Sequence, residues 1–376
     1  MKEAIVVGRI YGIPVKIHFT FLLIIPFLAW VIGSNFSFIA ERAGVPLENL
    51  LLNPYLSSLI MALALFFSVL LHELAHSRVA QSQGLGVTSI TLMLFGGVAH
   101  LEEGMEDPKK EVLIAMAGPL TSLIIGAILL ITFSIFPFQN FPDLKVMGIY
   151  LGQINIFLAF FNLIPAFPTD GGRIMRSLLA RRASYLDATR IATTVGQIFA
   201  FLFVLLGLLL GNFILIFIAV FIFIGASQEY RQTLDRITLA DFKVKDLMTK
   251  DVSTIDENAT VEELLERILT ELHSGYPVFS DGKLKGCVTI GDAGKVDPEK
   301  RNEYRVKDIM SRDIKKVSPN DNVYEVLKKL STYDIGRLMV FENENLVGII
   351  TRSDIMKGFR LQQIQKGLSK TQLHSE

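Results

Sequence analysis

Residues 56–80 read LSSLIMALALFFSVLLHELAHSRVA, an apolar run that ends in two histidines and a glutamate. A helix needs about 20 apolar residues to cross the hydrocarbon core of a bilayer, and this run is long enough. Residues four apart share one face of a helix, so His72 and His76 can reach one metal ion with Glu73 beside them. Ionisable residues near the end of a membrane span are costly unless they are paired or functional. The run therefore predicts a membrane helix that carries a metal site.

The rest of the chain divides into an apolar half and a polar half. The 376 residues are 51% hydrophobic, with a mean hydropathy of +0.43 and a net charge of zero from 37 basic and 37 acidic residues. Long apolar runs occupy the chain up to about residue 226, and from about residue 240 the composition is that of a soluble protein. Zero net charge without a Lys/Arg-rich block argues against nucleic acid as a principal partner. The sequence predicts a multi-pass α-helical membrane protein followed by a soluble α/β module.

Six apolar stretches are candidate membrane spans. They are residues 17–35, 56–80, 111–136, 146–167, 190–210 and 212–226, of which the last is short. Lysine and arginine gather before the first span and after the second and the fourth, while the loops on the opposite side are poor in both. Because positive charge marks the cytoplasmic side of a membrane protein, we expect a cell-membrane protein with both termini and the soluble module in the cytosol.

Two stretches near the membrane have the alternation of strands. Residues 4–17 are broken at Gly12-Ile-Pro14, and residues 86–101 are predicted to turn at Gly96-Gly97. Non-helical backbone survives at membrane depth only where protein or water covers it, so an ordinary interfacial loop is the alternative for each stretch. If they are strands, an exposed edge could pair with an extended peptide.

A catalytic zinc site usually has three protein ligands, so the histidine pair needs a partner. The segment NLIPAFPTDGG (162–172) ends the fourth span, and its prolines should break the helix and leave Asp170 in irregular backbone on the side of the histidines. Pairing with a metal also explains how the charge of Asp170 is tolerated there. His100 is the rival ligand. With a metal bound, Glu73 would take a proton from the attacking water and pass it to the leaving amine.

The two motifs, HELAH at the end of one span and NLIPAFPTDGG after a later one, resemble those of the site-2 protease family of intramembrane zinc metalloproteases. The resemblance covers the whole membrane half. It implies that His72, His76 and Asp170 bind one zinc ion and that Glu73 is the catalytic acid/base. It also implies that Asn162 holds the substrate backbone or the developing oxyanion.

Two glycine-containing segments also resemble features of that family. Gly96-Gly97 falls where the family has a membrane-dipping strand near the active site. Ala117-Gly118-Pro119 matches a feature of the third span, for which we expect a packing role. A substrate helix hides its carbonyls in its own hydrogen bonds, so it must unwind before attack. An edge within residues 86–101 would then capture the unwound segment, and lateral parting of helices is the expected gate.

The polar half contains an internal repeat, in which residues 244–292 and 306–354 align at a constant offset of 62 without gaps. GCVTIGD (286–292) matches GIITRSD (348–354), and each unit reads strand, helix, strand, strand, helix. Two units this similar should pack about a pseudo-twofold axis. The pattern resembles a tandem pair of CBS domains, a regulatory module that often binds adenine nucleotides and commonly dimerises.

The CBS resemblance implies a nucleotide site. It assigns Thr289 with Asp292, and Thr351 with Asp354, to contacts with phosphate and ribose, and ATP or AMP is the expected ligand. A threonine hydroxyl can donate to phosphate and an aspartate can accept from ribose hydroxyls. The alternative is that the two aspartates only cap the helices that follow them. A homodimer through the CBS domains is also expected.

These observations predict four regions: residues 1–228 as the protease domain, 229–243 as a linker, 244–297 as CBS domain 1, and 298–376 as CBS domain 2 with a C-terminal tail. The predicted function is zinc-dependent cleavage of single-span membrane proteins within the bilayer, modulated by adenine nucleotide. A transporter or channel is one alternative, but it would have no use for Glu73 between two histidines. An inactive relative acting as a membrane chaperone is another, and the intact motifs count against it.

Overall fold

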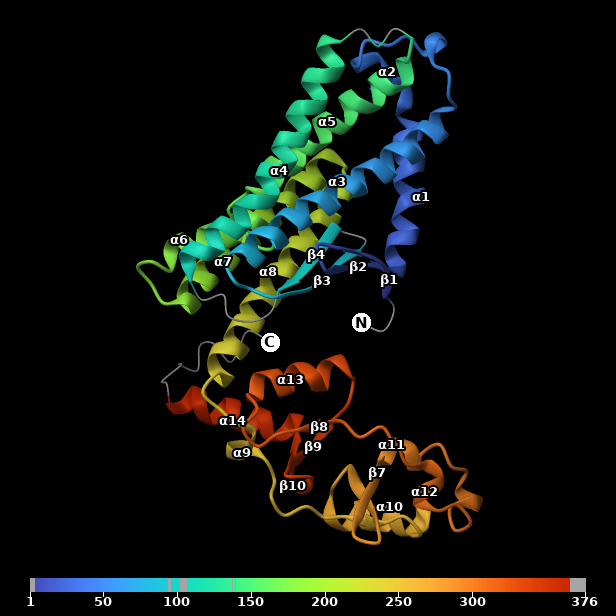
Figure 1. Ribbon diagram of the computed structural model, residues 1–376, viewed down its shortest axis with the longest axis vertical. Coiled ribbons are helices and arrows are strands. Elements are labelled where there is room, and N and C mark those ends of the chain that lie inside the picture. The colour runs from blue at the N-terminus through green and yellow to red at the C-terminus, as the bar shows by residue number, and fades with distance from the viewer. Residues whose placement is uncertain (1–3, 94–95, 102–106, 137, 139, 366–376) are drawn as a thin grey trace. The chain divides into compact units, whose positions relative to one another are not determined.

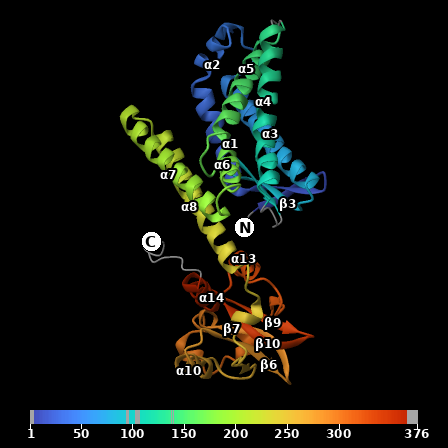
Figure 2. The ribbon, with the colours of Figure 1, turned by 90° about the vertical axis from the view of Figure 1, so that its left-hand side faces the viewer.

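The computed structural model describes residues 4–93, 96–101, 107–136, 138 and 140–365. The chain divides into two compact units, Met1–Thr233 and Leu234–Glu376, and the division falls within one helix. Figure 1 and Figure 2 show the first unit as a bundle of long helices with a small sheet, and the second as short helices and strands. The predicted combination of a helical membrane part and an α/β module is confirmed.

Long apolar helices build the first unit. Those long and apolar enough to cross a membrane are, among the described residues, α3 (Pro54–Ser82), α4 (Pro108–Ile135), α5 (Pro142–Asn162), α7 (Tyr185–Leu210) and α8 (Phe213–Leu239). A sixth span would combine α1 (Phe19–Ser34) with α2 (Phe36–Arg42), which meet at a bend of 63°. Shorter helices are η1 (Leu47–Asn49) and α6 (Asp170–Leu179). The final helix is much longer than its predicted apolar span, because it continues through polar residues after 226.

Local signals set where these helices begin. Prolines open α3, α4 and α5, at a position where the missing N–H has no helical partner to lose. The side chains of Asn53 and Asp107 accept hydrogen bonds from the backbone N–H groups of Tyr55 and Lys109. Gly211 ends α7 in the left-handed region, at φ +63°, and lets the chain reverse into α8. Figure 2 shows the resulting hairpin of α7 and α8.

Small and polar side chains join the central helices. A Cβ at Gly126 of α4 would lie 2.9 Å from the carbonyl oxygen of Gly152 of α5, so the two backbones meet closely there. The Asn155 amide of α5 donates to the Ser68 hydroxyl of α3 over 3.2 Å. These contacts hold α3, α4 and α5 together around the end of α3 that carries the HELAH motif.

A four-stranded sheet packs beside α3. Its order is β1 (Ala4–Ile10), β2 (Ile13–His18), β3 (Val87–Met93) and β4 (Gly96–Leu101), with β2 and β3 parallel and the other pairs antiparallel. Strands rather than interfacial loops are therefore confirmed. The turn predicted at Gly96-Gly97 is wrong, because both glycines already pair with β3 as the start of β4. The residues between the two strands, 94–95, lie outside the described part of the chain.

The second unit holds the two repeats. The first contains α9 (Val244–Leu247), β5 (Ile255–Asp256), α10 (Val261–Glu271), β6 (Gly275–Ser280), β7 (Lys283–Thr289) and α11 (Ile290–Ala293). After η2 (Pro298–Lys300), the second contains α12 (Val306–Ile309), β8 (Lys316–Val317), α13 (Val323–Thr332), β9 (Arg337–Glu342), β10 (Asn345–Thr351) and α14 (Arg352–Gln365). Each repeat forms a three-stranded sheet with the same pairing, parallel then antiparallel.

The repeats exchange their first segments. Val244 of the first repeat is buried in the core of the second, beside Ile350. In return, Val306 of the second repeat is buried in the core of the first, beside Val288. The exchanged segments also pair through their backbones with the other repeat, Thr249 with Ile349 and Ser311 with Cys287. Each repeat therefore needs the other to complete its hydrophobic core.

Candidate metal centre

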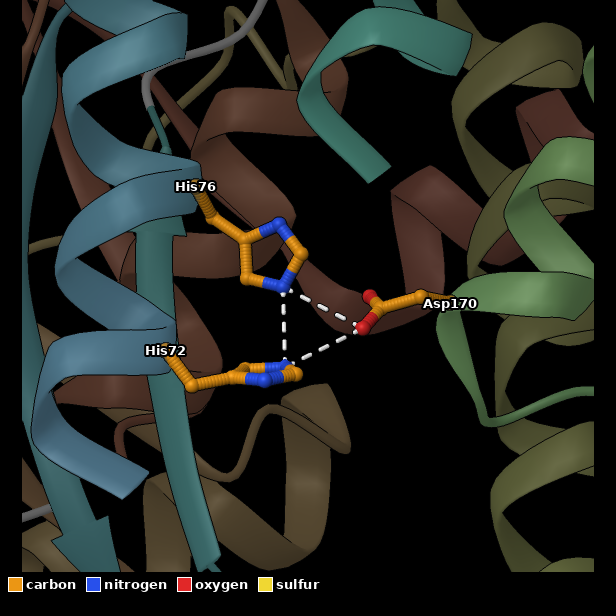
Figure 3. A group of neighbouring side chains, drawn as sticks. All are labelled: His72, His76 and Asp170. Carbon is orange, nitrogen blue, oxygen red and sulfur yellow. Dashed lines mark hydrogen bonds and ion pairs between the residues drawn. The ribbon is translucent and has the colours of Figure 1, made fainter. Parts of the chain in front are cut away.

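Three side chains that are far apart in the sequence meet inside the first unit. The Nε2 atoms of His72 and His76 lie 3.2 Å apart, and each lies 3.2 Å from Oδ2 of Asp170 (Figure 3). Both histidines are buried, and the side chain of Asp170 is 12% exposed. Four-coordinate zinc holds its ligand atoms at about 2.0–2.1 Å, which places neighbouring ligand atoms about 3.3–3.4 Å from one another. The three atoms therefore have the spacing of three corners of a zinc tetrahedron.

The other nitrogen of each ring is held by a neighbour on α4. Nδ1 of His76 lies 2.7 Å from the carbonyl oxygen of Ile114, and Nδ1 of His72 lies 2.9 Å from the hydroxyl of Ser122. A carbonyl only accepts, so Nδ1 of His76 carries a proton, and Nε2 is the nitrogen whose lone pair is available to a metal ion. Two such nitrogens and a carboxylate oxygen that face one another at 3.2 Å are ligand types that zinc prefers. The donor set fits a divalent metal ion.

Gly118 of α4 keeps the space for that ion open. A Cβ at this position would lie 2.5 Å from Nε2 of His72 and closer still to Nε2 of His76. A side chain at residue 118 would therefore enter the space that the two ligand nitrogens face. Sequence reasoning expected only a packing role here. The available signal was that Gly118 and Ser122 are four residues apart and so share one helix face.

Asp170 is the first residue of α6 rather than part of irregular backbone, so that expectation is wrong. The prolines do end α5 before the segment, but a new helix begins at Asp170. Thr169 precedes it, and its hydroxyl donates to the carbonyls of Ile164 and Ala166 in the loop. Gly171 allows this start, because a Cβ there would collide with the carbonyl of Ile164. The loop and the beginning of α6 thus pack backbone against backbone, and this packing fixes Asp170 opposite α3.

Glu73 lies between the two histidines in α3 and faces the sheet. A Cβ at Gly97 of β4 would lie 3.1 Å from Cδ of Glu73 and closer still to its Cγ. Only a glycine lets the strand pass so near this side chain. Strand β4 is an edge of its sheet in the described part of the chain, so the edge strand lies beside Glu73.

Two other predicted residues are less well placed. Asn162 is the last residue of α5, and its amide donates to the carbonyl of Leu158 over 3.0 Å. His100, the rival ligand, belongs to β4, but its side chain lies outside the described residues.

The four predicted nucleotide contacts form two capping pairs in the second unit. Oδ2 of Asp292 accepts from the backbone N–H of Thr289 at 3.1 Å and from its hydroxyl at 2.7 Å. Thr351 and Asp354 repeat this geometry at the same two distances. Partial burial acts to raise the pKa of Asp292, but the bonds from Thr289 and the ammonium of Lys295 together outweigh it and hold the pKa below its usual range. The capping role is therefore observed, and the second carboxylate oxygen of each aspartate lies outside the cap.

Comparison with known proteins places this arrangement in a family. Residues 60–149 and 143–206 match the model of peptidase family M50, and residues 244–295 and 306–360 match the CBS domain. A zinc metalloprotease of Methanocaldococcus jannaschii is 35% identical over 373 residues, covering 98% of this chain and 99% of that protein. Stage IV sporulation protein FB of Bacillus subtilis is 29% identical over 175 residues, covering 45% of this chain and 58% of that protein. A solved site-2 protease from Methanocaldococcus jannaschii has 37% sequence identity and a TM-score of 0.44, covering 60% of this chain and 95% of its own.

A bundle of membrane helices that surrounds two histidines and an aspartate, followed by paired regulatory repeats, defines the class of membrane metalloproteases with CBS domains. The near full-length similarity makes the assignment specific. The chain belongs to peptidase family M50, the site-2 protease family, and is a zinc metalloprotease with a tandem CBS module.

Proposed function

We propose that the protein is an intramembrane endopeptidase that hydrolyses peptide bonds in or near the transmembrane segments of single-span membrane proteins. The observation that carries this proposal is the set of three donor atoms, each 3.2 Å from the other two, on helices of the membrane unit. Such a protease would act in regulated intramembrane proteolysis, releasing a membrane-tethered protein. His72 and His76 lie on α3, which is long and apolar enough to cross a membrane, and this favours a membrane-inserted substrate.

His72, His76 and Asp170 would hold the zinc ion. Bound there, zinc supplies Lewis acidity that polarises the attacking water and the scissile carbonyl. Glu73 takes a proton from that water and passes it to the leaving amine as the C–N bond breaks. Asn162 would donate its amide to the substrate backbone or to the developing oxyanion, in place of its present bond to Leu158.

The substrate would bind as an extended strand on the edge of β4. A transmembrane helix hides its carbonyls in internal hydrogen bonds, so a segment must unwind before it can be cleaved. The free edge of β4 offers backbone groups to such a segment. Because Gly97 packs against Glu73, a peptide paired there would pass close to the acid/base.

The arrangement in the cell follows from charge. With lysine and arginine gathered in the first, third and fifth non-membrane segments, both termini and the CBS module would lie in the cytosol and the bundle in the cell membrane. The domain boundaries that we propose are residues 1–228 for the protease domain, 229–243 for a linker, 244–297 for CBS domain 1, and 298–376 for CBS domain 2 with the C-terminal tail.

The CBS module would bind an adenine nucleotide, such as ATP or AMP, and modulate the protease. Each capping aspartate uses Oδ2 for its threonine and leaves Oδ1 facing a lysine three residues later, at 3.1 Å from Lys295 and 3.5 Å from Lys357. These Oδ1 atoms fit ribose hydroxyls, and the lysines and the threonine hydroxyls fit phosphate. A homodimer through the CBS domains is part of the same proposal.

Cleavage of a single-span test substrate by the purified protein in detergent tests the protease function. Wild type should cleave, Glu73→Gln should not, and both should retain one zinc ion per chain. The exposed glutamate in Glu41→Gln gives a matched control for the loss of a carboxylate and should cleave like wild type. Equal cleavage by wild type and Glu73→Gln would identify a contaminating protease and contradict the proposal.

A further inference from the structure

Arg176 is a buried cation on the helix that carries Asp170. It follows Asp170 by six residues in α6 and is 4% exposed. Its guanidinium donates through Nε and Nη2 to Glu111 of α4, the Nε distance being 3.0 Å. Through Nη1 it donates to Glu229 of α8 over 2.6 Å. One side chain thus ties α6 to two other helices.

The same guanidinium also contacts two aromatic rings. Its central carbon lies 4.8 Å from the ring centroid of Phe167, in the loop before Asp170, and 4.8 Å from that of Tyr185, at the start of α7. Glu111 is in turn fixed by the hydroxyl of Ser177, which donates to it over 2.6 Å. Four elements around α6 therefore meet at Arg176.

The buried ion pairs of Arg176 with Glu111 and Glu229 are not explained by folding stability alone. Removing three charges from water is costly, and apolar residues of similar volume often replace such a network without loss of stability. Charged partners do fix direction and distance, because a guanidinium bonds carboxylates in a fixed planar geometry. The network is therefore suited to setting the position of α6 and of the ligand at its first residue.

The opposite face of α6 borders an open apolar groove. Gly171, Ile174 and Leu178, which are three and four residues apart, line this groove of about 410 Å³. Met116 of α4 and Pro165 of the preceding loop form its other side. The Arg176 network therefore holds the face of α6 that is turned away from the groove.

We propose that Arg176 is a positioning residue for Asp170. Its bonds to Glu111 of α4 and Glu229 of α8 set the position of α6 and so hold Asp170 opposite His72 and His76. The rings of the two histidines are held from α4 through their Nδ1 atoms, so a shift of α6 would change the spacing of the three donor atoms. This inference rests on the proposed function of the metal centre.

The rate of zinc loss to an excess of chelator tests the proposal without relying on catalysis. Arg176→Gln should release zinc roughly 10-fold faster than wild type, in line with residues that support metal ligands, and Arg176→Lys should recover part of the difference. Cleavage by Arg176→Gln should show a lower kcat with an unchanged KM, because substrate binding is not altered. Wild-type zinc release in Arg176→Gln would overturn the positioning role.

A second variant tests the bond between Arg176 and α8. Glu229→Gln keeps the Arg176–Glu111 pair, so it should fold, and thermal unfolding checks this. It should release zinc faster than wild type and more slowly than Arg176→Gln, while the control Glu41→Gln should release zinc like wild type. A wild-type release rate in Glu229→Gln would overturn the part of the proposal that involves α8. If wild type binds zinc but does not cleave, only the proposed function fails, since the release rates stand by themselves.

Discussion

Replacing Gly118 by alanine should empty the metal centre while leaving the fold intact. The added methyl carbon would lie 2.5 Å from Nε2 of His72 and closer to Nε2 of His76. Non-bonded heavy atoms make contact at about 3.5 Å, so the overlap is about 1 Å or more. The rings cannot turn aside freely, because Ile114 and Ser122 hold their Nδ1 atoms from α4 itself.

The expected loss of zinc affinity follows from where the methyl group would lie. Changes outside the ligand set commonly weaken metal binding by about 10–100-fold, so a group that enters the metal's own space should weaken it by more than about 100-fold. Zinc content should fall from one ion per chain to below roughly a tenth. Helix formation works in the other direction, because alanine is favoured over glycine inside a helix by about 0.5–1 kcal/mol. Loss of zinc should therefore not be accompanied by loss of helix.

Elemental analysis of the purified protein, together with its thermal unfolding, measures both effects. Gly126→Ala is the matched control on the same helix. Its Cβ would meet Ile156 at 2.8 Å and the carbonyl of Gly152 at 2.9 Å, and neither of these residues is a metal ligand. That variant should unfold at a lower temperature and retain zinc. If Gly118→Ala retains one zinc ion per chain and cleaves like wild type, the assignment of the metal's position is wrong.

Three other changes have defined outcomes. Ser122→Ala removes the partner of Nδ1 on His72 and should weaken zinc binding by about 10–100-fold in chelator competition; wild-type affinity would refute the role of this bond. Gly97→Ala forces β4 and Glu73 apart and should lower kcat at least 10-fold, with zinc retained, whereas unchanged kcat would separate β4 from catalysis. In the CBS module, the pKa of Asp292 is held below its usual value, so the ionised carboxylate stabilises the folded state. This contribution is fully present above about pH 4 and is lost as the pH falls through the lower pKa of the folded state. Asp292→Asn should lose roughly 1 kcal/mol of unfolding free energy at pH 7 and less at low pH, and a pH-independent difference would contradict this account.

The sequence predicts best what depends on residues close together along the chain. Local patterns predict the spacing of His72 and His76 on one helix, the strands within residues 4–17 and 86–101, and the repeat in the CBS module. The structure contains all three. The meeting of Asp170 with the histidines could be predicted because the expected topology puts it on their side of the membrane and because its motif was recognisable. Its exact setting could not, because a helix start at Asp170 depends on backbone contact between Gly171 and Ile164.

Contacts between helices account for what the sequence did not reveal. The spacing of Gly118 and Ser122 places them on one face of α4, but it does not say that this face meets the histidines of α3, and that contact separates a packing glycine from one that faces a metal. The exchange of Val244 and Val306 between the repeats is equally hidden, because either core could bury a valine. In both cases the deciding interaction joins residues that are dozens of positions apart.

The charges after residue 226 show how this limit affects function. In sequence, Glu229 is one of several charged residues that mark the end of a membrane helix, and nothing distinguishes it from its neighbours. In the structure it is the partner of a buried arginine on the helix of the third metal ligand. A charge that only ended a membrane span would face water. Its contact with Arg176 instead ties α8 to the helix that carries Asp170, so a charge at the polar end of an apolar helix becomes part of the support of the metal centre.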